Sequence, residues 1–201
     1  MAKGKLIVIS APSGTGKSTI IGELMKDAEL KLEFSISATT RPPRGAEQHG
    51  VEYYFLTLED FKQRIENDEF AEYHEVYEDR FYGTLKSEIK RITDKGHNVV
   101  LDLDVLGGID VKKIYGKKAL AVFIKPPSIE TLRQRLLSRG TDSLEDINNR
   151  VARAEYELSL ANHYDACVVN DVLETAVAET REIITEFIRG LGTSRRALRA
   201  D

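Results

Sequence analysis

The stretch that decides the fold is Leu6-Ile7-Val8-Ile9-Ser10-Ala11-Pro12-Ser13-Gly14-Thr15-Gly16-Lys17-Ser18, an apolar run followed by a glycine-containing loop and a helical pattern. A strand, a loop with these glycines and a helix form the phosphate-binding arrangement of nucleotide-binding proteins. The glycines let backbone N–H groups point at anionic oxygens, and the helix adds the positive end of its dipole. The segment predicts a nucleoside triphosphate site made by Ala11, Pro12, Ser13, Gly14, Thr15, Gly16, Lys17 and Ser18.

Two side chains of this loop have a chemical task. Lys17 is placed to reach the β- and γ-phosphates, and the Ser18 hydroxyl to ligate Mg²⁺. Ala11 stands where the pattern usually has glycine, so its backbone must adopt a φ that a Cβ tolerates. The alternative is a turn that only connects a strand to a helix.

Composition and charge restrict the class of protein. The 201 residues are 41% hydrophobic and 31% charged, with a formal net charge of -4, which suits one α/β unit with insertions. An acidic chain lacks the basic surface typical of nucleic-acid binding, and no apolar stretch is long enough for a bilayer span or a signal sequence. With Cys167 as the single cysteine, there is no disulfide framework or zinc spacing. We expect a cytoplasmic protein without nucleic-acid, membrane or obligatory protein partners.

The apolar pattern predicts a parallel α/β core. Apolar runs suited to buried strands lie at 6–10, 33–38, 98–104, 119–124 and 165–169. Helical patterns follow them at 18–30, 85–95, 128–138, 143–161 and 172–188. Strands that alternate with helices form a five-stranded parallel sheet with right-handed crossovers.

One segment departs from this alternation. Arg41-Pro42-Pro43-Arg44-Gly45 cannot be helical, and strand patterns at 51–56 and 69–77 flank a helix expected from Thr57 to Asn67. We therefore expect one domain over 1–190 and a flexible tail over 191–201. Its parts are a core (1–36, 85–138 and 162–190), an inserted mixed α/β subdomain (37–84) and a small helical lid (139–161).

Asp102 and Asp104 stand two residues apart at the end of a predicted strand. Residues with this spacing share one face of a strand, and open parallel sheets bind ligands at the carboxyl ends of their strands. One carboxylate, which we assign as Asp102, is placed to support Mg²⁺, and the other to contact a nucleotide. The alternative is that both cap nearby backbone groups.

Two sets of arginines are candidates for binding phosphate. Arg41 and Arg44 flank two prolines, which stiffen the backbone and reduce the entropy lost on gripping a phosphate. Arg139 and Arg150 belong to a second basic set with Arg135 and Arg153, which is spread over a helix end, a glycine-containing loop and the following helix. A loop bordered by capped helices can close over phosphates. In the alternative interpretation Arg150 pairs with Asp146 one helical turn earlier, and these are ordinary solvated charges.

The chain resembles the guanylate kinases in several motifs that occur in the family's order. Besides the loop at 11–18, they are Ser37-Ala38-Thr39-Thr40-Arg41-Pro42-Pro43-Arg44-Gly45, Tyr82-Gly83-Thr84, Leu101-Asp102-Leu103-Asp104 and Ser138-Arg139-Gly140-Thr141. The resemblance runs from about Leu6 to Ile188. It implies a P-loop NTPase fold with a nucleoside-monophosphate-binding subdomain and a lid, which transfers the γ-phosphoryl group of ATP to GMP, and to dGMP, with Mg²⁺.

The resemblance also implies roles for individual residues. The grip on the GMP phosphate would be formed by Arg41, Arg44, Tyr53 and Tyr82. The guanine side would be formed by Ser37, Glu72, Thr84 and Asp104. The residues that act on the transferring phosphoryl group would be Lys17, Arg44, Arg139 and Arg150. The segment near the adenine of ATP would be Asn170 and Asp171.

The chemistry of guanine agrees with this assignment. Its N1–H and N2–H₂ are adjacent donors that the Glu72 carboxylate can accept, and its O6 accepts from the hydroxyls of Ser37 and Thr84. Adenine presents the opposite pattern and would leave buried polar groups unpaired. Two departures from the family bear on these contacts. Leu106 stands where glutamine is common, and the turn before Tyr82 is one residue longer, which leaves the placement of Thr84 open.

Two other functions fit a chain of this kind. One is a catalytically inactive interaction module, which typically loses the ATP loop that Lys17 and Ser18 retain here. The other is a kinase of the same fold that acts on another small phosphate ester. The histidines, which are interpreted as surface residues and neither ligands nor bases, are His49, His74, His97 and His163.

Overall fold

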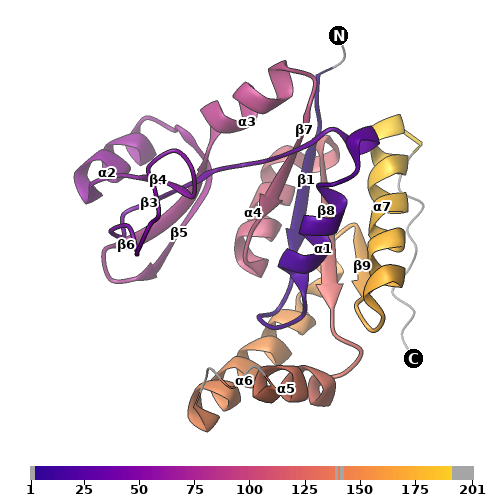
Figure 1. The fold of residues 1–201 in the computed structure, drawn as a ribbon. Coiled ribbons are helices and arrows are strands. Elements are labelled where there is room, and N and C mark those ends of the chain that lie inside the picture. The colour runs from indigo at the N-terminus through magenta and orange to yellow at the C-terminus, as the bar shows by residue number, and fades with distance from the viewer. Residues whose placement is uncertain (1–2, 139, 141–142, 192–201) are drawn as a thin grey trace.

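A parallel five-stranded sheet forms the centre of the computed structural model, which describes residues 3–138, 140 and 143–191 (Figure 1). The strand order is β2-β7-β1-β8-β9. Their bounds are β1 Leu6–Ser10, β2 Leu32–Phe34, β7 Asn98–Asp102, β8 Ala119–Lys125 and β9 Ala166–Val169. All the pairings are parallel, with Leu6 beside Val99 on one side and Ala119 on the other. The predicted α/β core with five parallel strands is confirmed.

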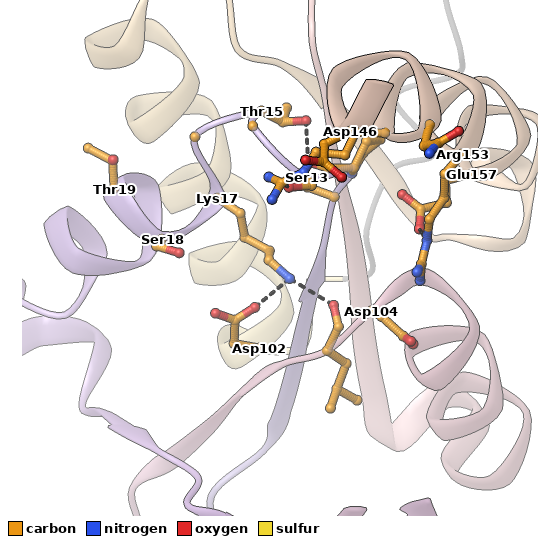
Figure 2. Close-up of a pocket in the computed structure, with 17 residues that line it drawn as sticks. Ser13, Thr15, Lys17, Ser18, Thr19, Asp102, Asp104, Asp146, Arg153 and Glu157 are labelled. Carbon is orange, nitrogen blue, oxygen red and sulfur yellow. Dashed lines mark hydrogen bonds and ion pairs between the residues drawn. The ribbon is translucent and has the colours of Figure 1, made fainter. Parts of the chain in front are cut away.

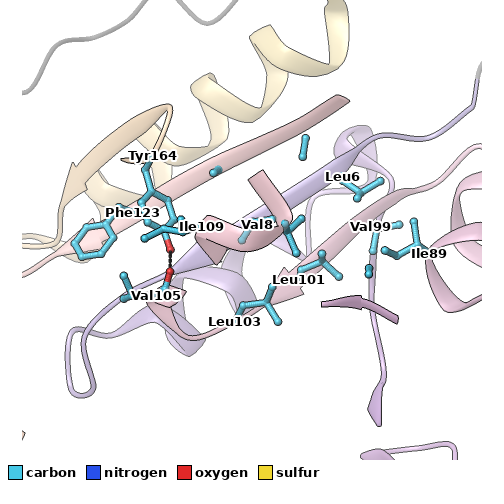
Figure 3. Close-up of a cluster of buried hydrophobic side chains, with 14 of the residues drawn as sticks. Leu6, Val8, Ile89, Val99, Leu101, Leu103, Val105, Ile109, Phe123 and Tyr164 are labelled. Atoms are coloured by element: carbon cyan, nitrogen blue, oxygen red, sulfur yellow. Dashed lines mark hydrogen bonds between the residues drawn. The ribbon is translucent and has the colours of Figure 1, made fainter. Parts of the chain in front are cut away.

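Helices cover both faces of this sheet (Figure 1). Ile7 and Ile9 of β1 point toward α1 (Lys17–Leu24) and α7 (Leu173–Arg189). Leu6 and Val8 point toward α3 (Lys86–Asp94) and α4 (Val105–Tyr115), in the cluster that Figure 3 shows. Strands covered on both faces are apolar at nearly every position, which is why β1 is a continuous hydrophobic run from Leu6 to Ile9.

The second sheet has four strands in the order β4-β3-β6-β5 and lies to one side of the core (Figure 1). Its elements are β3 Ser37–Thr39, β4 Tyr53–Phe55, α2 Leu58–Glu66, β5 Phe70–Tyr77 and β6 Arg80–Leu85. Helix α2 starts at the N-cap Thr57, whose side chain accepts from the Asp60 N–H. It covers the sheet through Phe61, which is fully buried and stacks on Phe70 with 4.3 Å between ring centroids.

Helices α5 (Ile129–Ser138) and α6 (Leu144–Ser159) pack against each other below the carboxyl ends of β1 and β8 (Figure 1). Their contact is the buried cluster of Leu132, Leu136, Ile147 and Ala154. Helix α6 begins with a reciprocal capping box between Ser143 and Asp146. This pair of helices therefore lies next to the edge of the sheet from which the phosphate loop emerges.

Several expected elements differ in the structure. The strand expected at 33–38 is two strands in different sheets, because the chain crosses from the core to the second sheet between β2 and β3. The helix expected to reach residue 30 ends at Leu24 and is followed by a 3-10 turn, Ala28–Leu30. Two further 3-10 turns are Gly116–Lys118 and Ala161–His163.

Helix α4 has no counterpart among the predicted elements. Gly107 and Gly108 in its first turns oppose helix formation, which hides it in the sequence. The strand expected to reach Asp104 ends at Asp102, and Asp104 is instead the N-cap of α4. Arg139 and residues 192–201 of the expected tail lie outside the described residues. Throughout the described ranges, every helix is too short or too polar to cross a lipid bilayer.

Candidate active site

The loop between β1 and α1 has the backbone that its glycines permit. Gly14 and Gly16 have φ angles of 91° and 95°, a region that side chains with a Cβ rarely adopt. A Cβ on Gly16 would also lie 2.5 Å from Nδ2 of Asn170. Ala11 is not among the described residues with a positive φ, so alanine is tolerated at that position.

A cavity of about 850 Å³ lies over this loop (Figure 2). Its lining includes every residue predicted to hold the triphosphate, from Ala11 to Ser18. The remaining lining residues come from α1, the end of β7, the start of α4 and α6, and they are Thr19, Asp102, Leu103, Asp104, Asp146, Asn149, Arg150, Arg153 and Glu157. Backbone amides, a lysine and arginines therefore face one volume, as an anionic ligand requires.

Lys17 is held at the end of β7. Its Nζ lies 2.5 Å from Oδ1 of Asp102 and donates to the carbonyl oxygen of Leu103 at 2.9 Å (Figure 2). The Ser18 hydroxyl and the Asp102 carboxylate line the same cavity and are the oxygen ligands that Mg²⁺ prefers. In the described part of the chain, no cluster of three or more His, Cys, Asp or Glu side chains is arranged to hold a metal by itself.

Asp104 serves the fold as well as the cavity. Its Oδ1 accepts a hydrogen bond of 2.8 Å from the Gly107 N–H and caps α4. The capping alternative is therefore correct for one oxygen of this carboxylate, while Asp104 still lines the cavity. Asp102, by contrast, is bound to Lys17.

A second cavity, of about 340 Å³, adjoins the first. Its lining from the second sheet is Ser37, Tyr53, Glu72, His74, Val76, Tyr82 and Gly83. It shares Asp102, Leu103, Asp104 and Arg153 with the first cavity. Two ligands can therefore lie end to end across the end of β7 and the start of α4.

Glu72 and Thr84 face each other across strands β5 and β6. They are register partners, and the Thr84 hydroxyl donates to Oε1 of Glu72 at 2.7 Å. Both side chains are buried. Burial raises the pKa of the Glu72 carboxyl, while the Thr84 hydrogen bond and the nearby His74 act in the opposite direction. This register places Thr84 opposite Glu72, although the turn at Glu78 and Asp79 is longer than usual in the family.

Known proteins resemble the chain over nearly its whole length. The guanylate kinase family profile matches residues 3–187. The guanylate kinase of Bacteroides thetaiotaomicron is 60% identical over 185 residues, which cover 92% of this chain and 90% of that protein. The guanylate kinase of Porphyromonas gingivalis is 59% identical over 184 residues, which cover 92% of this chain and 98% of that protein. The chain belongs to the guanylate kinase family.

A solved guanylate kinase has the same fold. The crystal structure of guanylate kinase from Anaplasma phagocytophilum superimposes with a TM-score of 0.69 at 28% sequence identity, and covers 99% of this chain and 92% of that one. The guanylate kinase resemblance and the α/β P-loop fold predicted from the sequence are both confirmed.

Of the two arginines expected to grip phosphate, Arg41 contacts the ring of Tyr53, which lines the second cavity. The Arg41 guanidinium donates to both carboxylate oxygens of Glu47, at 2.6 and 2.7 Å, and stacks 4.8 Å from the centre of the Tyr53 ring. The side chain of Arg44 is exposed, and its backbone N–H donates to Glu47. The described lining of the two cavities includes neither arginine.

Other predicted residues take positions around the phosphate loop. Arg150 lines the first cavity, and its Nη1 donates to the Ser13 hydroxyl at 3.3 Å. Asn170 supports the loop from behind, because its Nδ2 donates to the Thr15 carbonyl oxygen at 2.7 Å. Asp171 follows it and is exposed. Leu106, the departure from the usual glutamine, is 45% exposed in the first turn of α4.

His74 lines the second cavity but was not among the predicted site residues, whereas Arg153, a member of the second basic set, lines both cavities. The interpretation of His74 as a surface residue at a loop or element end is wrong, because it lies within β5. Its distance of two residues from Glu72 was the available signal, since alternate residues of a strand share a face. Arg153 lies on α6 within hydrogen-bond distance of Glu157, 2.8 Å from Nε to Oε1.

Proposed function

We propose that the chain transfers the γ-phosphoryl group of ATP to GMP, and to dGMP, and releases ADP and GDP or dGDP. The observation that carries this proposal is the pair of adjoining cavities, one over the phosphate loop and one around Glu72. Phosphoryl transfer depends mainly on holding donor and acceptor in line and on neutralising the charge of the migrating group. The reaction belongs to purine nucleotide metabolism and GMP recycling in the cytoplasm.

The donor site is the loop from Ala11 to Ser18. Its backbone N–H groups would hold the ATP phosphates, and Lys17 would exchange Asp102 for a phosphate oxygen. Ser18 and Asp102 would hold Mg²⁺, which when bound neutralises charge on the phosphate oxygens. We assign Asn170 and Asp171 to the adenine side, where Asn170 also fixes the loop.

The acceptor site is the second cavity. The ionised Glu72 would accept from N1–H and N2–H₂ of guanine, with Ser37, Thr84 and Asp104 completing the base contacts. The GMP phosphate would be held by Arg41, Arg44, Tyr53 and Tyr82. Arg41 would then exchange Glu47 for the phosphate, since both offer oxygen pairs that match a guanidinium.

We assign residues 37–84 as the GMP-binding subdomain and residues 139–161 as the lid. Helices α5 and α6 stand over the phosphate loop, and Arg150 already contacts Ser13 there. Closure would bring Arg139 and Arg150 to the transferring phosphoryl group together with Lys17 and Arg44.

A coupled assay of ADP release tests the proposed function. The protein is supplied with ATP, Mg²⁺ and, in turn, GMP, dGMP, AMP, UMP, CMP and a sugar phosphate, and we expect turnover with the two guanine nucleotides only. A Lys17→Ala variant serves as the control for contaminating kinases. Transfer to none of the nucleotides would favour an interaction module, and transfer to a sugar phosphate but not to GMP would favour another kinase of this fold.

A further inference from the structure

His74 and Glu72 lie next to each other on the cavity face of β5. The register from Glu72 to His74 is regular, opposite Thr84 and Tyr82 respectively, so the two side chains point the same way. Both line the second cavity. A Cβ built on Gly107 would lie 3.2 Å from Oε2 of Glu72 and 3.6 Å from Cδ2 of His74. Both side chains therefore meet the start of α4 at the same place.

Asp110 of α4 lies next to the Nε2 atom of the His74 ring. Its Oδ2 lies 3.4 Å from Nε2 of His74, and its Oδ1 accepts from Nζ of Lys113 at 3.1 Å. Nε2 is buried and has no well-aligned hydrogen bond to any described atom. The imidazole is thus placed between Glu72 and Asp110, and it connects the second sheet to a helix of the core.

Glu72 lies where a carboxylate is hard to keep ionised. Only 8% of the residue is exposed, and burial raises the pKa of its carboxyl. The hydrogen bond from Thr84 and the charge of His74 both lower this pKa, while the negative charge of Asp104 raises it. Guanine recognition needs the ionised form, because a protonated carboxyl offers one acceptor fewer to N1–H and N2–H₂.

The other groups that face this pair come from several elements. The titratable or charged residues that line the cavity with Glu72 and His74 are Tyr53 of β4, Tyr82 of β6, Asp102 of β7, Asp104 before α4 and Arg153 of α6. Arg153 is bonded to Glu157, so part of its charge is compensated. His74 differs from all of them because it lies on the same strand face as Glu72 and its imidazole can carry a positive charge beside that carboxylate.

We propose that His74, held by Asp110, is a positioning residue that keeps Glu72 ionised and oriented for guanine. The inference rests on the proposed function, because it assumes that Glu72 contacts the base. A cation beside the carboxylate extends guanine binding to lower pH. Loss of this cation should weaken GMP binding and leave nucleotide binding at the phosphate loop unchanged.

The pH dependence of kcat/KM for GMP tests this role. In His74→Gln, we expect the acid limb to move to higher pH by about 0.5–1 unit, because a positive charge near the carboxylate is lost. At one pH on the acid limb the loss in kcat/KM should approach roughly 3–10-fold, and at one pH on the plateau above it the loss should be less than about twofold. The KM for ATP should not change. Calorimetric GMP binding at the same two pH values gives a second readout without turnover.

Three variants complete the experiment. His74→Lys keeps a positive charge and should return the acid limb to its wild-type position or below it. Glu72→Gln removes the titrating carboxyl and should weaken GMP binding. The part of the acid limb that arises from the protein should be absent in this variant. His163→Gln replaces an exposed histidine in a 3-10 turn and should match the wild type. The GMP phosphate titrates near pH 6 in all of them, so it cancels in the comparison.

The outcomes separate the two proposals. If the wild type neither binds nor phosphorylates GMP, the proposed function is wrong. If it does so, but His74→Gln has the wild-type acid limb, or His74→Lys shifts it upward as glutamine does, His74 does not support the charge of Glu72. A uniform loss at every pH in both His74 variants would show a purely structural role and would also overturn the inference.

Discussion

Charged residues of the site are paired with carboxylates of the chain itself. Lys17 binds Asp102 at 2.5 Å, and Arg41 binds Glu47 through two hydrogen bonds. The bond to Glu47 raises the pKa of the Arg41 guanidinium and lowers that of Glu47 to about 2. A phosphate that carries two charges competes for such cations better than a singly charged group does. The pairs thus hold the cations in position while selecting for a highly charged ligand.

Arg150→Ala should reduce turnover much more than it weakens GMP binding. Arg150 lines the donor cavity and contacts Ser13, so its guanidinium can reach charge that develops on the transferring group. By analogy with arginine fingers, we expect kcat to fall by up to about 10³-fold. Arg133→Ala, on α5 and bonded to Asn148, is the matched control. Equal kcat values in the two variants would remove Arg150 from the catalytic role.

Thr84→Val should damage guanine recognition through Glu72. The buried hydroxyl donates to Oε1 of Glu72, and its loss leaves a buried carboxylate oxygen without that donor. We expect KM for GMP to rise about tenfold or more and stability to fall by about 1–3 kcal/mol. Thr180→Val, where a buried hydroxyl donates only to a carbonyl oxygen within α7, provides the comparison. Steady-state kinetics and urea unfolding of both variants would reveal whether the effect is specific to Glu72.

Elements with strong local signals were predictable, and elements set by distant contacts were not. The strand of residues 6–10, the glycine loop and the Thr57 and Ser143 caps follow from local chemistry, and the structure has them. The break between β2 and β3 depends on which sheet each half pairs with, which no local pattern encodes.

In the site, residues 11–18 could be placed from their spacing alone. The bond between Arg41 and Glu47 could not, because it depends on the fold of the intervening turn.

Substitution of glycine by alanine should have opposite effects on stability at two positions in different elements. A Cβ on Gly83 of β6 would lie 2.8 Å from the Glu72 carbonyl oxygen and 2.9 Å from Phe70 and Tyr73, so strand β5 would have to shift. We expect Gly83→Ala to lower stability by about 1–3 kcal/mol. Gly22 of α1 has no atom within 4 Å of such a Cβ, and alanine there should add about 0.5–1 kcal/mol. Thermal unfolding of both variants checks the two signs together.

Across the whole molecule, the two sheets are joined by a buried polar contact beside the chain crossings. Glu88 of α3 accepts from the Tyr54 hydroxyl at 3.0 Å and from the Ile36 N–H at 3.4 Å. Arg91 links Glu88 to Glu33 of β2, with distances of 2.6 Å to each. The second sheet is thus tied to the core by hydrogen bonds around one buried carboxylate.

The charge cluster at this junction should make stability depend on pH in the acid range. Burial acts against ionisation of Glu33, but hydrogen bonds from His97, Arg91 and Lys95 lower its pKa from 4.5 to about 2. A carboxyl with a lowered pKa in the folded state stabilises the fold above its unfolded value, and this contribution is lost as the pH falls from about 4.5 toward 2. Glu33→Gln should therefore cost about 1–2 kcal/mol at neutral pH and about half of that or less near pH 3. Urea unfolding at both pH values, with exposed Glu66→Gln as the control, measures the difference. An equal cost at the two pH values would mean that the charge of Glu33 does not stabilise the junction.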